Sequence, residues 1–455
     1  MRHEMEKALP SQLKEFVSES QYLQIAKDML AHAKQKGASQ AEVALHASTG
    51  LNVTVRLNEV ETLEFNRDKA VGVTVYFGKQ KGSASTTDIS PTSLKSTIEA
   101  ACDLAKLTEP DPYSGLADIH EMAKAIPDLD LYHPWDLTVD NAVNLAKACE
   151  RTALSLDKKI SNSEGATLAS SQGFHVYGNS HGFLGAYPTS RHSLSCMVIA
   201  QDAQGMERDY QYTVSRQKEM LAKAETVGLE AATRALKRLS AKKLPTQRVP
   251  VIFHSSIASS VIGHFLSAIS GGRLFRKSSF LLDSLNKKHF PDNIQISERP
   301  HILGGIGSAP FDSDGVATND KELVQNGVIT SYILSAYSAR KLNLPNTGNA
   351  GGTHNIFVAS TQGDFDSMLK IMGRGLVVTE LMGQGINLVT GDYSRGASGF
   401  WVEHGEIQFP VHEITIAGNL QNMFKQLIGV GSDIDKRGSI QSGSLLIEEM
   451  TLAGV

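Results

Sequence analysis

The sequence predicts an α+β protein with an N-terminal mixed α/β region and a mainly antiparallel, β-rich C-terminal domain. In the first half, apolar residues recur first at helical and then at strand spacing. From Val251 to Val455, short strand-like runs, turns and glycine clusters dominate. A chain of 455 residues exceeds the size of one hydrophobic core, so two or three domains are expected.

The first predicted elements are a helix and two strands. Residues 1–18 are expected to form a flexible extension ahead of them. The helix has its apolar residues one turn apart, at Leu23, Ala26, Leu30 and Ala33. Apolar residues that recur at every second position, with mostly polar residues between them in the first stretch, then predict half-buried strands at residues 51–57 and 71–77.

Two further helices have recognisable start signals. Ser90 followed by Pro91 begins one, and Thr138 caps the other. Between them, residues 111–137 are rich in proline and aspartate, which predicts an irregular connection and a break between two subdomains. Frequent glycines in residues 165–213 predict a series of short strands, followed by a helix near residues 218–240.

The predicted domain boundary lies at a proline-rich segment, Leu244 to Pro250, which contains two prolines. It separates an N-terminal domain, residues 19–245, from a C-terminal domain, residues 246–455. In the C-terminal domain, helices are expected near residues 256–270, 334–341 and 364–372. The basic residues before the boundary (Arg234, Lys237, Arg238, Lys242 and Lys243) are interpreted as a solvated helix C-terminus.

Composition excludes several classes of protein. With 44 basic and 48 acidic residues, the net charge of −4 does not suit a nucleic-acid-binding surface. Apolar runs are shorter than the ~18 residues of a membrane span, and the charged N-terminus does not resemble a secretory signal. Three cysteines, Cys102, Cys149 and Cys196, suit free thiols in a reducing compartment. A cytoplasmic protein is therefore predicted.

Standard catalytic motifs are absent from the sequence. It contains no HExxH, GxSxG, Walker-type phosphate loop or CxxC pair. The glycine pairs at 383–385 and 429–431 lack the full dinucleotide-binding pattern and are interpreted as turns. His254 and His264 flank a predicted helix almost three turns apart, so they cannot bind one ion from a straight helix.

A second histidine pair leaves an alternative open. His404 and His412 are eight residues apart across a predicted turn, and a hairpin could bring them together. With a nearby acid such as Glu403 or Glu413, they would form the site of an independently active metallopeptidase.

Long sequence strings throughout the chain resemble the TldD/PmbA family of metallopeptidases, in its TldE (PmbA) branch. The resemblance covers essentially the whole length and is carried by GKQKGSASTTDISP (78–91), MERDYQYT (206–213), PFDSDGV (310–316), GVITSYILSAYSARKL (327–342), GLVVTELMGQG (375–385), GDYSRGASGFWVEHGEIQFPVHEITIAGNL (391–420) and SIQSGS (439–444).

The resemblance implies a degenerate metal site. In the TldD branch, a helix at this point carries HExxxH, and its two histidines bind a metal together with a C-terminal cysteine. Aligned on Gly263 and His264, this chain has Ser259 at the first histidine and Ser260 at the glutamate. The C-terminal region has no cysteine, and the neighbourhood reads Lys436-Arg437-Gly438-Ser439. Without three ligands and a general base, no bound metal and no catalytic residue are expected in this chain.

Partners also follow from the resemblance. It implies pairing with a TldD-type subunit that holds the metal ion, expected to be zinc, in a homo- or hetero-oligomer that cleaves unfolded peptides. The family is linked to peptide maturation and proteolysis. Its older description as a modulator of DNA gyrase leaves a further alternative, a non-enzymatic regulator of a DNA-associated target.

Two stretches are candidates for peptide binding. Glu380, Gly383 and Gly385 end a strand that could pair with an extended peptide, unless that strand is already paired on both sides. Asp392, Tyr393 and Arg395 lie in a glycine-bounded stretch. Alternatively, Asp392 and Arg395 pair with each other and only stabilise a turn.

Overall fold

The structure is a computed structural model that describes residues 19–454. The extension expected at residues 1–18 lies outside the described residues. The chain forms two compact units. The first comprises the described residues up to 199, with 209–233 and 310–318. The second comprises residues 200–208, 234–309 and 319 onward. The α+β prediction is confirmed, with antiparallel pairing predominant.

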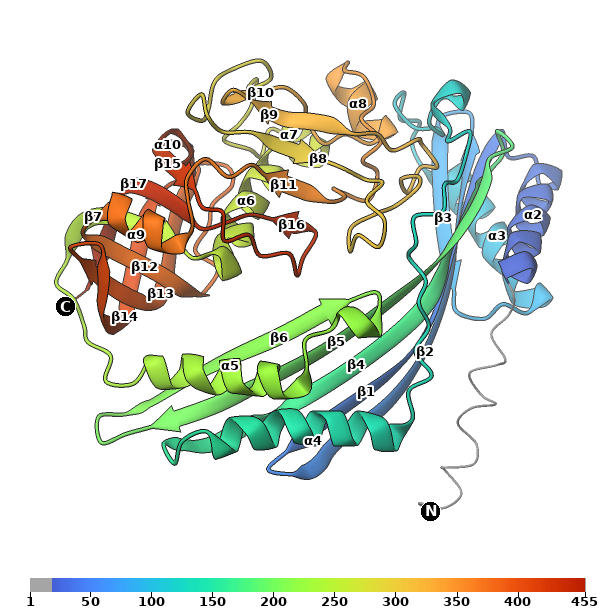
Figure 1. Cartoon of the computed structure of the whole chain (residues 1–455). Helices are drawn as coiled ribbons and strands as arrows, with labels where there is room; N and C mark the ends of the chain where they lie inside the picture. Colours follow the sequence, from blue (N-terminus) through green and yellow to red (C-terminus); the bar gives the residue numbers. More distant parts are fainter. Residues whose placement is uncertain (1–18, 455) are drawn as a thin grey trace. The chain divides into compact units, whose positions relative to one another are not determined.

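A six-stranded sheet, ordered β3-β2-β1-β4-β5-β6, dominates the first unit (Figure 1). Its strands are β1 (Gln40–Arg56), β2 (Glu59–Phe77), β3 (Gln80–Thr86), β4 (Ile160–Asn179), β5 (Leu184–Gln201) and β6 (Met206–Ser215).

The prediction of short strands at residues 165–213 was right for the turns at Gly182 and Gly205 but wrong elsewhere, because β4 and β5 run straight through the other glycines. Gly173 lies opposite Ser48, and a Cβ there would come within 2.3 Å of the Ala47 carbonyl oxygen. Such a glycine within a strand permits close strand approach and does not end the strand.

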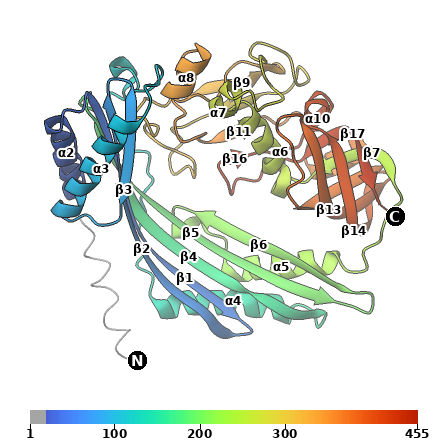
Figure 2. The ribbon, with the colours of Figure 1, turned by 180° about the vertical axis from the view of Figure 1, so that it is seen from behind.

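Four helices accompany this sheet: α2 (Glu19–Gln35), α3 (Pro91–Leu107), α4 (Val139–Ser155) and α5 (Ala224–Lys237). Ser90 and Thr138 cap α3 and α4 as predicted, with side-chain oxygens that accept from the backbone N–H of Ser93 and Asn141. Helices α4 and α5 run along the sheet (Figure 2). The core between α2, α3 and the sheet is formed by Tyr22, Ala26, Met29, Val43, Leu45, Val73, Val75, Ile98 and Ala101.

The second unit contains two sheets. A small five-stranded sheet, ordered β10-β9-β8-β11-β16, comprises β8 (Ile296–Glu298), β9 (Lys321–Gln325), β10 (Val328–Ile329), β11 (Ile356–Val358) and β16 (Ile440–Gln441). A six-stranded sheet, ordered β14-β13-β12-β7-β17-β15, comprises β7 (Gln247–Phe253), β12 (Gly375–Met382), β13 (Asp392–Glu403), β14 (Glu406–Asn419), β15 (Leu427–Val430) and β17 (Leu445–Ala453).

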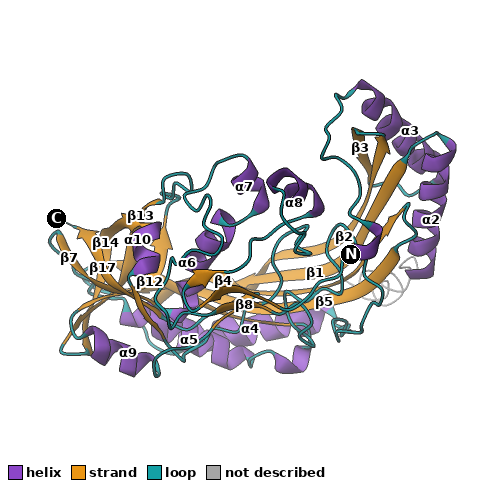
Figure 3. Ribbon diagram, turned by 90° about the horizontal axis from the view of Figure 1, so that it is seen from above, coloured by secondary structure: helices purple, strands orange, loops and turns teal. Residues whose placement is uncertain are grey.

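Helices cover both faces of this six-stranded sheet. They are α6 (Ser255–Ala268), α9 (Phe365–Met372) and α10 (Leu420–Lys425), with α7 (Gly271–Phe275) and α8 (Ala336–Leu342) nearby. Successive β7 residues face opposite sides: Val251 and Phe253 pack in the core with α6 and α10, and Ile252 packs with α9. Figure 3 shows α9 and α10 on opposite sides of the sheet.

Helix length and composition also bear on membranes. Among the helices of residues 19–454, none is both long and apolar enough to cross a bilayer.

Candidate functional site

Helix α6 presents the positions of the degenerate metal site. It begins directly after β7, and the Nδ1 of His254 caps it by accepting from the Ser256 N–H at 3.2 Å. Its buried stripe includes Val261, Ile262 and Phe265. Ser259, Ser260 and His264 lie beside this stripe and are half-buried.

His264 faces residues from strand β13. Its ring approaches the ring of Tyr393, with centroids 6.1 Å apart. Burial lowers the pKa of His264, and the charge of Arg395 lowers it further. Tyr393 is 1% exposed, and burial raises its pKa while Arg395 opposes that rise. The structure therefore brings together His264, Tyr393 and Arg395 from stretches far apart in the sequence.

Alternation along β13 explains this grouping. Tyr393 and Arg395 are two residues apart and share the face toward α6, while Asp392 and Ser394 are exposed on the other face. The carboxylate of Asp392 instead accepts from Thr390 Oγ1 at 2.6 Å and from Asn419 Nδ2 at 3.4 Å. The alternative pairing of Asp392 with Arg395 is therefore absent from this part of the structure.

The side chains around His264 do not fit a catalytic metal ion. They offer one imidazole, three neutral hydroxyls and a guanidinium, whereas a catalytic zinc takes three histidine, cysteine or carboxylate ligands. Position 263 faces Ile440 on β16, with 3.9 Å between a Cβ built there and Ile440 Cδ1. Nearby, Arg437 forms an ion pair with Asp435 at 2.6 Å.

The strand proposed for peptide binding is half paired and half open. In β12, Leu376 to Val378 bond to β13 on one side and β7 on the other. Glu380 to Met382 pair only with β13, because the β7 register ends at Phe253 opposite Val378. Residues 382–385 are exposed. One edge of Glu380–Met382 is therefore open within the described residues.

Glu380 itself already has a partner. Its carboxylate pairs with the buried guanidinium of Arg238, which also lies 3.5 Å from Glu207. The interpretation of residues 234–243 as a solvated helix end is thus wrong for Arg238, whose side chain is 9% exposed. It holds for Lys237, which is exposed.

The two glycines that follow β12 have different roles. Gly383 has φ +78 and open space around its Cα, so it supplies a turn. Gly385 packs against β13, where a Cβ would come within 1.9 Å of the Ser394 carbonyl oxygen. The Ser394 N–H donates to the Gly385 carbonyl at 2.7 Å.

The alternative histidine pair is not brought together. His404 lies in the turn between β13 and β14, whereas His412 lies six residues beyond Glu406, or about 20 Å along the strand. His412 Nδ1 lies 2.8 Å from Glu207, and Glu413 pairs with Lys243 at 2.5 Å. Glu403 accepts from the indole N–H of Trp401 at 3.1 Å.

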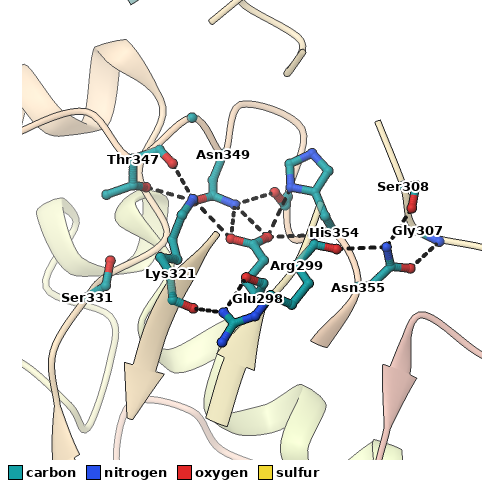
Figure 4. A network of polar contacts seen from close by, with 12 residues as sticks. Glu298, Arg299, Gly307, Ser308, Lys321, Ser331, Thr347, Asn349, His354 and Asn355 are labelled. Atoms are coloured by element: carbon teal, nitrogen blue, oxygen red, sulfur yellow. Dashed lines mark hydrogen bonds and ion pairs between the residues drawn. The ribbon is translucent and has the colours of Figure 1, made fainter. Parts of the chain in front are cut away.

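A buried carboxylate network went undetected in the sequence, because it follows no motif. Glu298 on β8 is fully buried and accepts from the Asn349 amide at 2.9 Å, from the His354 backbone N–H at 2.6 Å, and from His354 Nδ1 at 3.0 Å (Figure 4). Lys321 Nζ lies 3.0 Å away. Burial alone would raise the pKa of Glu298, but the hydrogen bonds from His354 and the charge of Lys321 lower it to about 2.

A group of ligand-type side chains was also missed, although its spacing is visible in the sequence. Asp118, His120 and Glu121 lie within 4.8 Å of one another around a short 3₁₀ helix. Asp118 and His120 are exposed, and the Glu121 carboxylate accepts from the Asp118 backbone N–H at 3.3 Å. These contacts form a helix cap and give no sign of a ligand.

The chain is similar to proteins of one family along most of its length. Models of the PmbA/TldA metallopeptidase domain 1, central domain and C-terminal domain match residues 41–105, 132–239 and 246–454. The Metalloprotease PmbA of Escherichia coli O157:H7 is 52% identical over 93% of this chain and 94% of its own length. In Haemophilus influenzae, the Metalloprotease PmbA homolog is 50% identical, covering 96% of this chain and 97% of its own. The Metalloprotease TldD homolog of that organism is 22% identical, covering 86% and 88%.

Solved structures share the fold. A candidate modulator of DNA gyrase from Bacteroides thetaiotaomicron superposes with a TM-score of 0.91 at 26% identity, covering 97% of this chain and all of its own. TldE from Thermococcus kodakarensis superposes with a TM-score of 0.80 at 20% identity, covering 94% and 100%.

Proposed function

We propose that this chain, which belongs to the PmbA/TldD metallopeptidase family, is the TldE-type subunit of a two-component enzyme that cleaves unfolded peptides. In this proposal the catalytic metal, zinc, is bound by a TldD-type partner. This chain contributes peptide-binding surface and subunit interface, and acts in peptide maturation and proteolysis in the cytoplasm.

The observation that carries the proposal is the set of side chains around His264. Ser259 and Ser260 are weak neutral ligands, and neither can take a proton from an attacking water as a carboxylate would. Arg395 places a positive charge beside the only imidazole of this cluster. A divalent cation would be repelled from such a site.

The relatives support the same division of roles. Haemophilus influenzae has both a PmbA homolog and a TldD homolog, and this chain is far more similar to the first. The open edge of Glu380–Met382 supports a role in peptide binding, since an extended peptide can add to an exposed strand through backbone hydrogen bonds.

The test is metal content and peptidase activity of the purified chain, alone and mixed with a TldD-type partner, on an unfolded peptide. We expect no zinc in the chain alone and cleavage only in the mixture. Stoichiometric zinc together with chelator-sensitive activity in the chain alone would refute the proposal. His264→Ala, His404→Ala and His120→Ala would then show which group holds the ion.

A further inference from the structure

Arg395 is a half-buried cation without a carboxylate partner. Its Nε is buried and makes no hydrogen bond, and a terminal nitrogen donates to the Leu381 carbonyl at 3.4 Å. Within residues 19–454, no carboxylate lies within ion-pair distance of it. By contrast, Arg238, Arg299 and Arg437 are each paired with an acid. Because burying an unpaired charge is costly, Arg395 indicates an anion supplied by another molecule.

Three more buried polar atoms of this cluster lack hydrogen-bond partners. The Tyr393 hydroxyl, Ser260 Oγ and His264 Nε2 are all buried without a hydrogen bond of good geometry, although the Arg395 guanidinium is close enough to the Tyr393 hydroxyl to oppose the rise in its pKa that burial causes. Ser260 and His264 are four residues apart on α6, so they lie on the same side of the helix. Both hydroxyls can donate, as can a neutral imidazole protonated at Nε2. Buried hydrogen-bond donors are normally paired, so these unpaired donors indicate a ligand that supplies hydrogen-bond acceptors.

The open strand edge lies next to this cluster. Arg395 reaches the carbonyl of Leu381, which belongs to the segment Glu380–Met382 that pairs on one side only. Glu380 is held by Arg238, so it does not neutralise Arg395. A peptide bound on this edge would run past the guanidinium. The planar fork of an arginine matches the two oxygens of a carboxylate.

We propose that Arg395, assisted by Tyr393, Ser260 and His264, binds a carboxylate of a peptide that pairs with the open edge of β12. This inference rests on the proposed function and names the chemistry that the peptide must carry. The carboxylate is either the C-terminal group or the side chain of an aspartate or glutamate.

The test measures binding of labelled seven-residue peptides to the full chain alone by fluorescence anisotropy. One peptide is neutral with a free C-terminus, the second is its C-terminal amide, and the third is the amide with one internal glutamate. We expect a carboxylate-bearing peptide to bind about tenfold or more tightly than the plain amide. Preference for the first or third peptide identifies the source of the carboxylate.

Variants assign the effect to this site. Arg395→Gln should remove the advantage of the carboxylate peptides over the amide, while Arg395→Lys should restore part of it. Arg248→Gln is the matched control, because Arg248 is 70% exposed and pairs with Glu449 elsewhere. Circular dichroism confirms that each variant is folded. Equal binding of all three peptides, no binding at all, or an unchanged preference in Arg395→Gln would overturn the inference. Zinc content and activity of the mixture, which test the proposed function, are measured separately.

Discussion

The ring of His264 on α6 approaches the ring of Tyr393 on β13, with centroids 6.1 Å apart and planes inclined at 65°. His264 belongs to the degenerate metal-site positions, and Tyr393 to the candidate peptide-binding stretch. Their contact joins two groups that were identified separately into one site, and Arg395 adds a positive charge to it.

Restoring the metal-ligand positions alone should give only weak zinc binding. In a Ser259→His, Ser260→Glu variant, we expect the added substitution Arg395→Gln to strengthen zinc binding about tenfold or more, because it removes repulsion between a guanidinium and a divalent cation. Zinc affinity is measured by competition with a coloured chelator. Adding Arg248→Gln in place of Arg395→Gln is the control. The same affinity in both triple variants would contradict the repulsion argument.

Arg238→Ala should destabilise the second unit strongly. The substitution leaves the carboxylates of Glu207 and Glu380 without their cation, and breaking a buried pair costs about 3–5 kcal/mol. Urea unfolding measures the change, with Lys237→Ala as the control, since Lys237 is the exposed last residue of α5 and the neighbour of Arg238. Equal stability of the two variants would show that the buried network contributes little.

Gly385→Ala should disturb the peptide-binding segment more than Gly383→Ala. A Cβ at position 385 would overlap the Ser394 carbonyl, and such overpacking costs about 3 kcal/mol. At position 383 the space is open, so only the positive φ is penalised, by about 1 kcal/mol. Thermal unfolding together with peptide anisotropy separates the two, and a larger loss in Gly383→Ala would be the contrary result.

Stability should depend on pH through Glu298. The folded state lowers the pKa of Glu298 from 4.5 to about 2, so its contribution is complete above pH 4.5 and is lost as pH falls toward 2. The shift corresponds to about 3 kcal/mol.

The free energy of unfolding of Glu298→Gln should therefore fall less steeply between pH 4.5 and 2 than that of the unsubstituted chain. Glu322→Gln is the control, because Glu322 also pairs with a cation, Arg299, but is 36% exposed. Parallel pH profiles for all three proteins would exclude a special role for Glu298.

Features with local causes were predictable from the sequence. The starts of α3 and α4 depend on a capping side chain a few residues from the N–H that it accepts, so Ser90 and Thr138 identified them. The length of β4 was not predictable, because the reason for Gly173 is the backbone of β1 across the sheet.

The site was predictable only in its parts. The positions Ser259, Ser260 and His264 came from family resemblance, and Tyr393 and Arg395 from a glycine-bounded stretch. Their proximity depends on β13 packing its inward face against α6, which no local pattern encodes. The partners of Glu298 come from strand β9 and from the loop between α8 and β11, 23 to 56 residues further along the chain, so no spacing rule could reveal that network.

Each unit includes a short segment that lies, in the sequence, within the other unit. Residues 200–208 belong to the second unit, and residues 310–318 belong to the first. Phe311, in the latter segment, packs edge-on against Phe183 and Tyr187 at 5.2 and 5.3 Å. A gene fragment cut near residue 245 would therefore encode a first unit without part of its own core. Recombination near residue 245 would separate the first unit from residues 310–318 and the second unit from residues 200–208. The two halves of the gene therefore have to be inherited together.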